Sequence, residues 1–179
     1  KIKNFKLTNS FNFLNNYSKI FFLIGVPFLI TLISFFCFTK TGRDDSYITY
    51  GISENMIKGS LKGYNNYLYE QTSSIFFAGI ISIISFFSRV SLIWSSIIVS
   101  FFSVFFIYLI SFNYLLKKKG KVFALLSLLG LAMIPSFSYW NWSGLENPLS
   151  TLLSFLLLIM INNFFKFQKK FLLIWILVF

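Results

Sequence analysis

Long stretches without a charged side chain constrain this chain more than any other feature of its sequence. They cover residues 20–38, 74–88, 90–116, 122–142 and 149–165, and a last run, 171–179, ends with the chain. About 20 apolar residues cross the hydrocarbon core of a bilayer, and about 17 are the practical minimum. Four runs therefore predict membrane spans, at about 20–38, 90–116, 122–140 and 149–165, and 171–179 predicts a truncated fifth.

The predicted fold is all-α and polytopic, with residues 1–179 as one partial transmembrane domain. The chain starts at Lys1 without a methionine, which favours a fragment of a longer protein. Its composition is 56% hydrophobic and 12% charged, whereas soluble domains are about 25% charged. A nucleic-acid binder needs positive charge clustered on a water-soluble face. We therefore expect a membrane protein with no nucleic-acid partner, although the net charge is +11.

Two absences narrow the chemistry further. The chain has no histidine and a single cysteine, Cys37. Ser-His-Asp triads, Cys-His pairs and histidine-based zinc sites are therefore excluded, and no disulfide can form within the chain. No metal site is predicted, and a divalent cation held by carboxylates is the one cofactor that stays open.

The run 74–88 is too short for a confident span, and charge placement decides its interpretation. If it lies along the membrane, all the lysines outside the loops 39–73 and 141–148 fall on one side; they are Lys1, Lys3, Lys6, Lys19, Lys117, Lys118, Lys119, Lys121, Lys166, Lys169 and Lys170. Short basic loops favour the cytoplasm. We therefore expect a membrane-parallel helix over 74–88 and a cytoplasmic N-terminus.

This topology places every acidic residue on the extracytoplasmic side. Four acids lie in the outer loop 39–73 and one in the outer loop 141–148; they are Asp44, Asp45, Glu54, Glu70 and Glu146. The net positive charge is then a signal for insertion, and the outer loops are where the sequence predicts chemistry.

The first outer loop predicts a helix that begins at Asp44 and runs to about Lys58. Ile48, Ile52 and Met56 recur at helical spacing and predict its buried stripe. Asp44 and Asp45 open the helix, where the helix dipole favours carboxylates. The pair either serves only this structural role or acts in catalysis, as a general base or as cation ligands.

The second outer loop contains Glu146, followed by Asn147 and Pro148. Asn147 is expected to cap the next helix, with Pro148 at its first position. Glu146 is then either a partner of the helix dipole or a substrate-binding group. Trp140 and Trp142 are better explained as aromatic residues of the membrane interface than as platforms for a sugar.

Arg89 follows the predicted membrane-parallel helix and has two interpretations. It either anchors that helix at the headgroups or clamps a phosphate, because a guanidinium can bind phosphate oxygens in bidentate fashion. Lys58 and Lys62 are rivals for the phosphate-binding role.

Two segments resemble the outer loops of the GT-C superfamily of membrane glycosyltransferases. Residues 44–50 read DDSYITY and lead to Asn55, Gly59 and the pair Tyr64 and Asn65. Residues 143–149 read SGLENPL, and residues 69–74 read YEQTSS. The pattern is most similar to bacterial arabinofuranosyltransferases and to the protein mannosyltransferase and aminoarabinose transferase group, many of which also place an Arg where Arg89 stands.

The resemblance implies that a sugar moves from a polyprenyl-phosphate donor to an acceptor hydroxyl, with inversion, on the outer face of the bacterial inner membrane. The acceptor would be a glycan, a lipid or a protein. Asp44 would be the general base, supported by Asp45. The donor and acceptor would be bound by residues that include Glu146, Arg89, Lys58, Tyr47 and Asn55.

A transporter or flippase is the alternative function. It would use the outer-loop carboxylates to bind an ion or a substrate. Such a protein usually carries charged side chains within its spans, and the predicted spans contain no Asp, Glu, Lys or Arg.

Overall fold

The structure is a computed structural model that describes residues 16–38, 44–60, 62–63 and 74–167, with the side chains of 16–17 and 163–167 left out. All its regular elements are helices, listed here in chain order: α1 (Asn16–Cys37), α2 (Asp44–Ile57), α3 (Ile75–Ser88), α4 (Leu92–Lys119), α5 (Lys121–Met133), α6 (Pro135–Asn141) and α7 (Asn147–Phe167). The predicted all-α fold is confirmed for this part of the chain. The predicted span 171–179 and the segment 64–73 lie outside the described residues.

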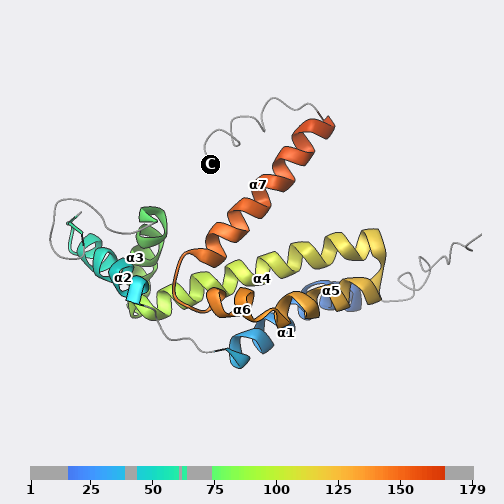
Figure 1. Cartoon of the computed structure of the whole chain (residues 1–179), viewed down its shortest axis with the longest axis horizontal. Coiled ribbons are helices and arrows are strands. Elements are labelled where there is room, and N and C mark those ends of the chain that lie inside the picture. Colours follow the sequence, from blue (N-terminus) through green and yellow to red (C-terminus); the bar gives the residue numbers. More distant parts are fainter. Residues whose placement is uncertain (1–15, 39–43, 61, 64–73, 168–179) are drawn as a thin grey trace, which may run out of the picture.

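Helices α1, α4 and α5 lie side by side and form the main core (Figure 1). Ring contacts show that α1 and α4 are antiparallel, since Phe22 meets Phe112 at 5.5 Å and Phe35 meets Phe101 at 6.0 Å between ring centroids. The fully buried side chains between these helices are Val104, Tyr108, Phe112, Ala124, Leu128 and Trp142.

Among the residues that the structure describes, two helices are long and apolar enough to cross a membrane, α1 over Ser18–Cys37 and α4 over Leu92–Lys119. The pair α5 and α6 passes the same test together, but it is bent by 69°. Helix α3 and the Asn147–Asn162 part of α7 are apolar and shorter than a span. Membrane insertion is therefore supported by length and composition, with two spans or, if the bent pair is one span, three.

The predicted span over 122–140 is not one straight helix, because the helix breaks between Met133 and Pro135. Proline has no N–H and disfavours helical geometry in the residue before it, and Ile134 accordingly adopts φ −69° and ψ 111°. The break frees the Ala132 carbonyl, which accepts a hydrogen bond of 2.7 Å from the Ser138 hydroxyl. Serine side chains commonly satisfy backbone groups at such breaks in membrane helices.

Helix α3 is a separate short element, as predicted for 74–88. The Ser74 hydroxyl caps its N-terminus by accepting from the Phe77 N–H at 3.2 Å. Arg89 ends the helix in the left-handed conformation, with φ 56°. In Figure 1 α3 stands across the direction of α4 instead of running beside it.

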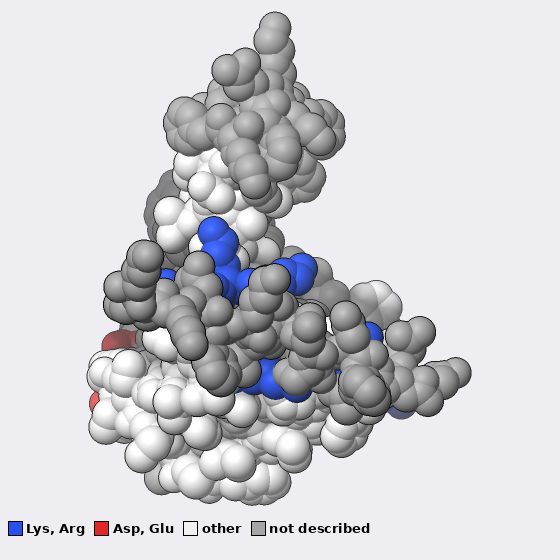
Figure 2. Space-filling model, turned by 90° about the vertical axis from the view of Figure 1, so that its right-hand side faces the viewer, with Lys and Arg blue, Asp and Glu red and all other residues white. Residues whose placement is uncertain are grey.

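The described acidic residues lie at one end of the molecule, together with Lys58, Lys62 and Arg89, and a cluster of four lysines lies at the other end. Lys117, Lys118, Lys119 and Lys121 surround the turn between α4 and α5, and Lys121 lies 5.5 Å from the ring centroid of Phe22, near the start of α1. Figure 2 views this end and shows basic side chains at its centre and acidic ones only at its margin. The described acids lie on α2 and just before α7, at the other end of the bundle.

Thiol accessibility tests whether α3 lies along the membrane. In a Cys37→Ser background, Ser60→Cys reports the chain before α3, Ser88→Cys reports its end, and Lys119→Cys reports the turn after α4. We expect an impermeant maleimide added to intact cells to label the first two variants and not the third. Labelling at Ser60→Cys and Lys119→Cys without labelling at Ser88→Cys would mean that α3 crosses the membrane.

Candidate functional site

Helix α2 buries a face that differs from the predicted one. Only Ile52 of the predicted stripe is buried, and Ile48 and Met56 stay partly exposed. The buried face is built mostly from hydroxyl-bearing side chains, namely Ser46, Thr49, Tyr50 and Ser53.

Small hydroxyl side chains hold α2 against α3. The Ser53 Oγ lies 3.1 Å from the Ala78 carbonyl oxygen, and the Ser82 Oγ lies 3.1 Å from the Ser53 carbonyl oxygen. Small residues let two helix backbones approach closely, and their hydroxyls bond across the contact. Each hydroxyl lies closer still to a carbonyl of its own helix, at 2.8 Å for Ser53 to Thr49 and 2.6 Å for Ser82 to Ala78, so each shares its single proton between α2 and α3.

Tyr50 joins α2 to two distant parts of the chain. Its hydroxyl shares a hydrogen bond of 2.8 Å with the Ser96 Oγ on α4 and donates a longer one, 3.4 Å, to the Gly144 carbonyl. The side chain is only 6% exposed. The two segments that carry the predicted acidic motifs therefore meet at one tyrosine.

Gly144 is required at this contact for two reasons. Its φ is +81°, a conformation that residues with a side chain rarely adopt. A Cβ atom added there would also collide with the Tyr50 hydroxyl and lie 3.6 Å from the Ser46 Cβ. The glycine in SGLENPL thus allows the loop before α7 to pack directly against α2.

Burial raises the pKa of the Tyr50 phenol above its ordinary value of 10.0, and hydrogen bonds with Ser96 and Ser46 oppose that change only in part. The folded protein therefore holds the phenolic proton more tightly than the unfolded chain does. This stabilisation is fully present below pH 10 and is lost as the pH rises through the folded-state pKa.

The acidic pair opens α2 as predicted. The helix begins at Asp44, so Asp44 and Asp45 lie in its first turn, and both are exposed. Glu146 is partly buried, and its carbonyl accepts the first hydrogen bond of α7 from the Ser150 N–H at 2.9 Å. Glu146, not Asn147, is therefore the residue that caps α7, one position before the predicted cap.

The other predicted binding residues have different surroundings. Tyr47 is about half exposed, and its ring packs edge-on against Tyr50 with centroids 5.8 Å apart. The Asn55 side-chain amide donates to the Lys62 and Gly63 carbonyls at 3.2 and 3.0 Å, so it holds the turn after α2.

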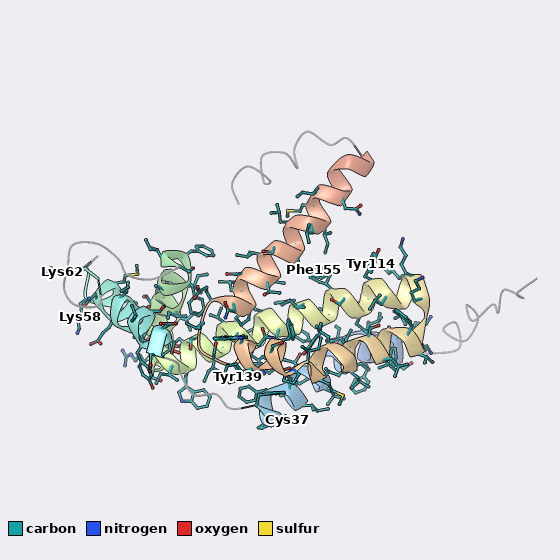
Figure 3. All side chains as sticks on the ribbon, in the orientation of Figure 1. Cys37, Lys58, Lys62, Tyr114, Tyr139 and Phe155 are labelled. Atoms are coloured by element: carbon teal, nitrogen blue, oxygen red, sulfur yellow. The ribbon has the colours of Figure 1, made fainter. Side chains whose placement is uncertain are left out.

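The three candidate phosphate-binding side chains lie at different places in the fold. Lys58 forms an exposed ion pair of 2.6 Å with Glu54. Both Lys58 and Lys62 lie at the far end of α2 (Figure 3). Arg89 is exposed at the end of α3, and its guanidinium forms no ion pair with any other described residue.

Trp142 is neither an interface anchor nor a sugar platform, which corrects the prediction for this residue. It is 1% exposed and packs edge-on against Phe35 at 5.2 Å. Its indole N–H donates to the Ser34 Oγ at 3.1 Å. Trp140, by contrast, is 45% exposed.

Within the described ranges, no group of three or more Cys, Asp or Glu side chains is placed to hold a metal ion. The acids that the structure describes are instead divided between the first turn of α2, the Glu54–Lys58 ion pair and the cap of α7.

Replacing Gly144 with alanine should destabilise the protein through both backbone strain and collision with Tyr50. Left-handed geometry at a non-glycine residue costs about 1–3 kcal/mol, and the collision adds to this. In a Tyr50→Phe background the collision is relieved, so Gly144→Ala should cost less there. Thermal unfolding midpoints in detergent measure both costs; equal costs in the two backgrounds would contradict the contact.

The raised pKa of Tyr50 predicts a pH effect on stability. As the pH rises above 10, the wild-type protein should lose stability more steeply than Tyr50→Phe, which has no phenolic proton to release. Thermal midpoints between pH 9 and pH 11 (about one unit on each side of the ordinary tyrosine pKa) measure the difference. The matched control is Tyr47→Phe, which removes a hydroxyl from a half-exposed side chain and should follow the wild type.

No family model, curated protein or solved structure matches this chain.

Proposed function

We propose that this chain belongs to a membrane glycosyltransferase of the GT-C type. It would transfer a sugar from a polyprenyl-phosphate donor to an acceptor hydroxyl on the extracytoplasmic side of the inner membrane. The fold would be the polytopic GT-C bundle, with α3 lying along the outer membrane surface.

The observation that carries this proposal is the contact of Tyr50 with Gly144. Tyr50 ends the segment DDSYITY, and Gly144 lies in SGLENPL, 94 residues further along the chain. These are the two segments whose resemblance suggests a glycosyltransferase, and each contains acidic residues. The contact brings these two acidic segments together at one place in the fold, as a shared site requires.

The charge distribution supports the orientation. Basic residues gather at the α4–α5 turn, and the described acids lie at the other end. Because short basic loops stay in the cytoplasm, the end with α2 and Glu146 would face outward. The donor sugar of such an enzyme is presented on that side.

The proposed reaction is a single displacement. The acceptor oxygen bonds to the anomeric carbon as the bond from that carbon to the phosphate oxygen breaks, which inverts the configuration. Asp44 takes the proton of the acceptor hydroxyl, and its place in the first turn of α2 stabilises the carboxylate until then. Arg89 is the preferred clamp for the leaving phosphate, because Lys58 is already paired with Glu54.

Asp44→Asn tests the proposed base. The variant should lose sugar transfer by about 10²-fold or more, the usual contribution of a general base, while it still inserts in the membrane. The readout is the glycan composition of the cell surface in a deletion strain that carries either the wild-type gene or the variant. Glu54→Gln is the matched control on the same helix and should retain transfer.

Full transfer by Asp44→Asn at normal protein levels would remove this mechanism. A transporter would give a different result in accessibility mapping. Cysteines near α2 would then react from both sides of the membrane in turn, whereas a transferase site opens outward only.

A further inference from the structure

A groove of about 910 Å³ runs between α6 and the first half of α7. It is lined on α6 by Trp140 and Asn141 and on α7 from Asn147 to Leu158. Glu146 immediately precedes its first α7 residue. The groove therefore begins at the acidic end of the second outer loop.

Asn141 is the buried polar group of the groove. It is 2% exposed, and its amide nitrogen Nδ2 has no hydrogen-bond partner among the described residues. Buried side-chain amides are nearly always hydrogen-bonded, because leaving one without a partner costs free energy. Asn141 also lines the groove, so this unpartnered amide borders the space that a ligand would occupy.

Hydrogen-bonding side chains follow one face of α7. Asn147, Ser150, Thr151 and Ser154 stand at positions i, i+3, i+4 and i+7, and all of them line the groove. Further along, Phe155 and Leu158 make the groove apolar. Figure 3 shows Phe155 partway along α7, past the N-terminal end of this helix, which lies near α6.

The lining selects an uncharged ligand. None of the described lining residues carries a charge, and a charged group placed there would lack a counter-ion. Hydroxyls and amides both donate and accept, which suits the hydroxyls of a sugar, and the exposed face of Trp140 offers an apolar surface beside them.

We infer that this groove binds the acceptor of the proposed transfer, and that the acceptor is a neutral glycolipid. Its sugar would lie beside Asn141, Asn147 and Ser150, and its chain would extend along Phe155 and Leu158 toward the centre of the bilayer. The role of this ligand as the acceptor rests on the proposed function. Its chemical class, a neutral glycolipid, follows from the lining of the groove.

Protection of a cysteine in the groove tests the inference without turnover. Ser150→Cys is placed in a Cys37→Ser background in intact membranes, with Ser88→Cys on α3 as the control outside the groove. We expect octyl glucoside, below the concentration that dissolves membranes, to slow maleimide labelling of Ser150→Cys at least threefold. Octanol and octyl phosphate should slow it much less, and Ser88→Cys should be unaffected.

Asn141→Asp keeps the size of the side chain and replaces the donor with an acceptor. It should raise the octyl glucoside concentration needed for protection about tenfold. Thr151→Val should also raise the octyl glucoside concentration needed for protection. Because Thr151 is exposed on α7, this substitution should disturb folding less than one at the buried Asn141.

Equal protection by octanol would show an apolar groove only and overturn the inference. Absent labelling of Ser150→Cys beside normal labelling of Ser88→Cys would show that another helix fills the groove, which also overturns it. If octyl glucoside does not protect Ser150→Cys but sugar transfer that depends on Asp44 is intact, only the assignment of the groove is refuted. If octyl glucoside protects Ser150→Cys but the protein transfers no sugar, only the proposed enzymatic function is refuted.

Discussion

The hydroxyl of Tyr50 organises the end of the molecule that carries its acidic residues. It bonds to Ser96 on α4 and reaches the Gly144 carbonyl, so it joins segments 46 and 94 residues away. A buried phenol needs such partners, because an unsatisfied hydroxyl is costly to bury. Helix α3 depends on the same arrangement through the hydroxyl contacts of α2, and Glu146 depends on it through the loop that Gly144 allows. Residues of both predicted motifs touch here.

Much of the helix order could be predicted from the sequence, because uncharged runs and turn residues mark most boundaries. Helix α2 begins at the predicted Asp44, and α3 falls within the predicted 74–88. The break before Pro135 could not be predicted, since a proline does not by itself interrupt a membrane helix: α1 continues through Pro27. The two prolines differ in their tertiary contacts. After Pro135, the Trp142 indole donates a hydrogen bond to Ser34 on α1, and the Ser138 hydroxyl donates to the freed Ala132 carbonyl.

The site was harder to predict than the helices for one physical reason. In water, the apolar face of a helix is the buried one, and that rule selected Ile48, Ile52 and Met56. In a membrane protein lipid is as apolar as leucine, so small and hydroxyl side chains pack inward instead. The candidate span α1 follows this pattern, since Phe21 and Phe36 are more than 70% exposed whereas Ser34 is buried, and α2 in the outer loop buries Ser46 and Ser53 in the same way. The recurrence of hydroxyl-bearing residues at helical spacing, Ser46, Thr49, Tyr50 and Ser53, is the feature of the sequence that identifies the buried face of α2.

The central claim is that the two acidic segments form one site, and a disulfide between them tests it most directly. A Cβ at Gly144 lies 3.6 Å from the Ser46 Cβ, within the range that a disulfide spans. The pair Ser46→Cys and Gly144→Cys, placed in a Tyr50→Phe and Cys37→Ser background to remove the collision and the native thiol, should cross-link under mild oxidation. The pair Glu54→Cys and Gly144→Cys should not. Failure of the first pair to cross-link in protein that inserts and elutes as a folded species would contradict the account.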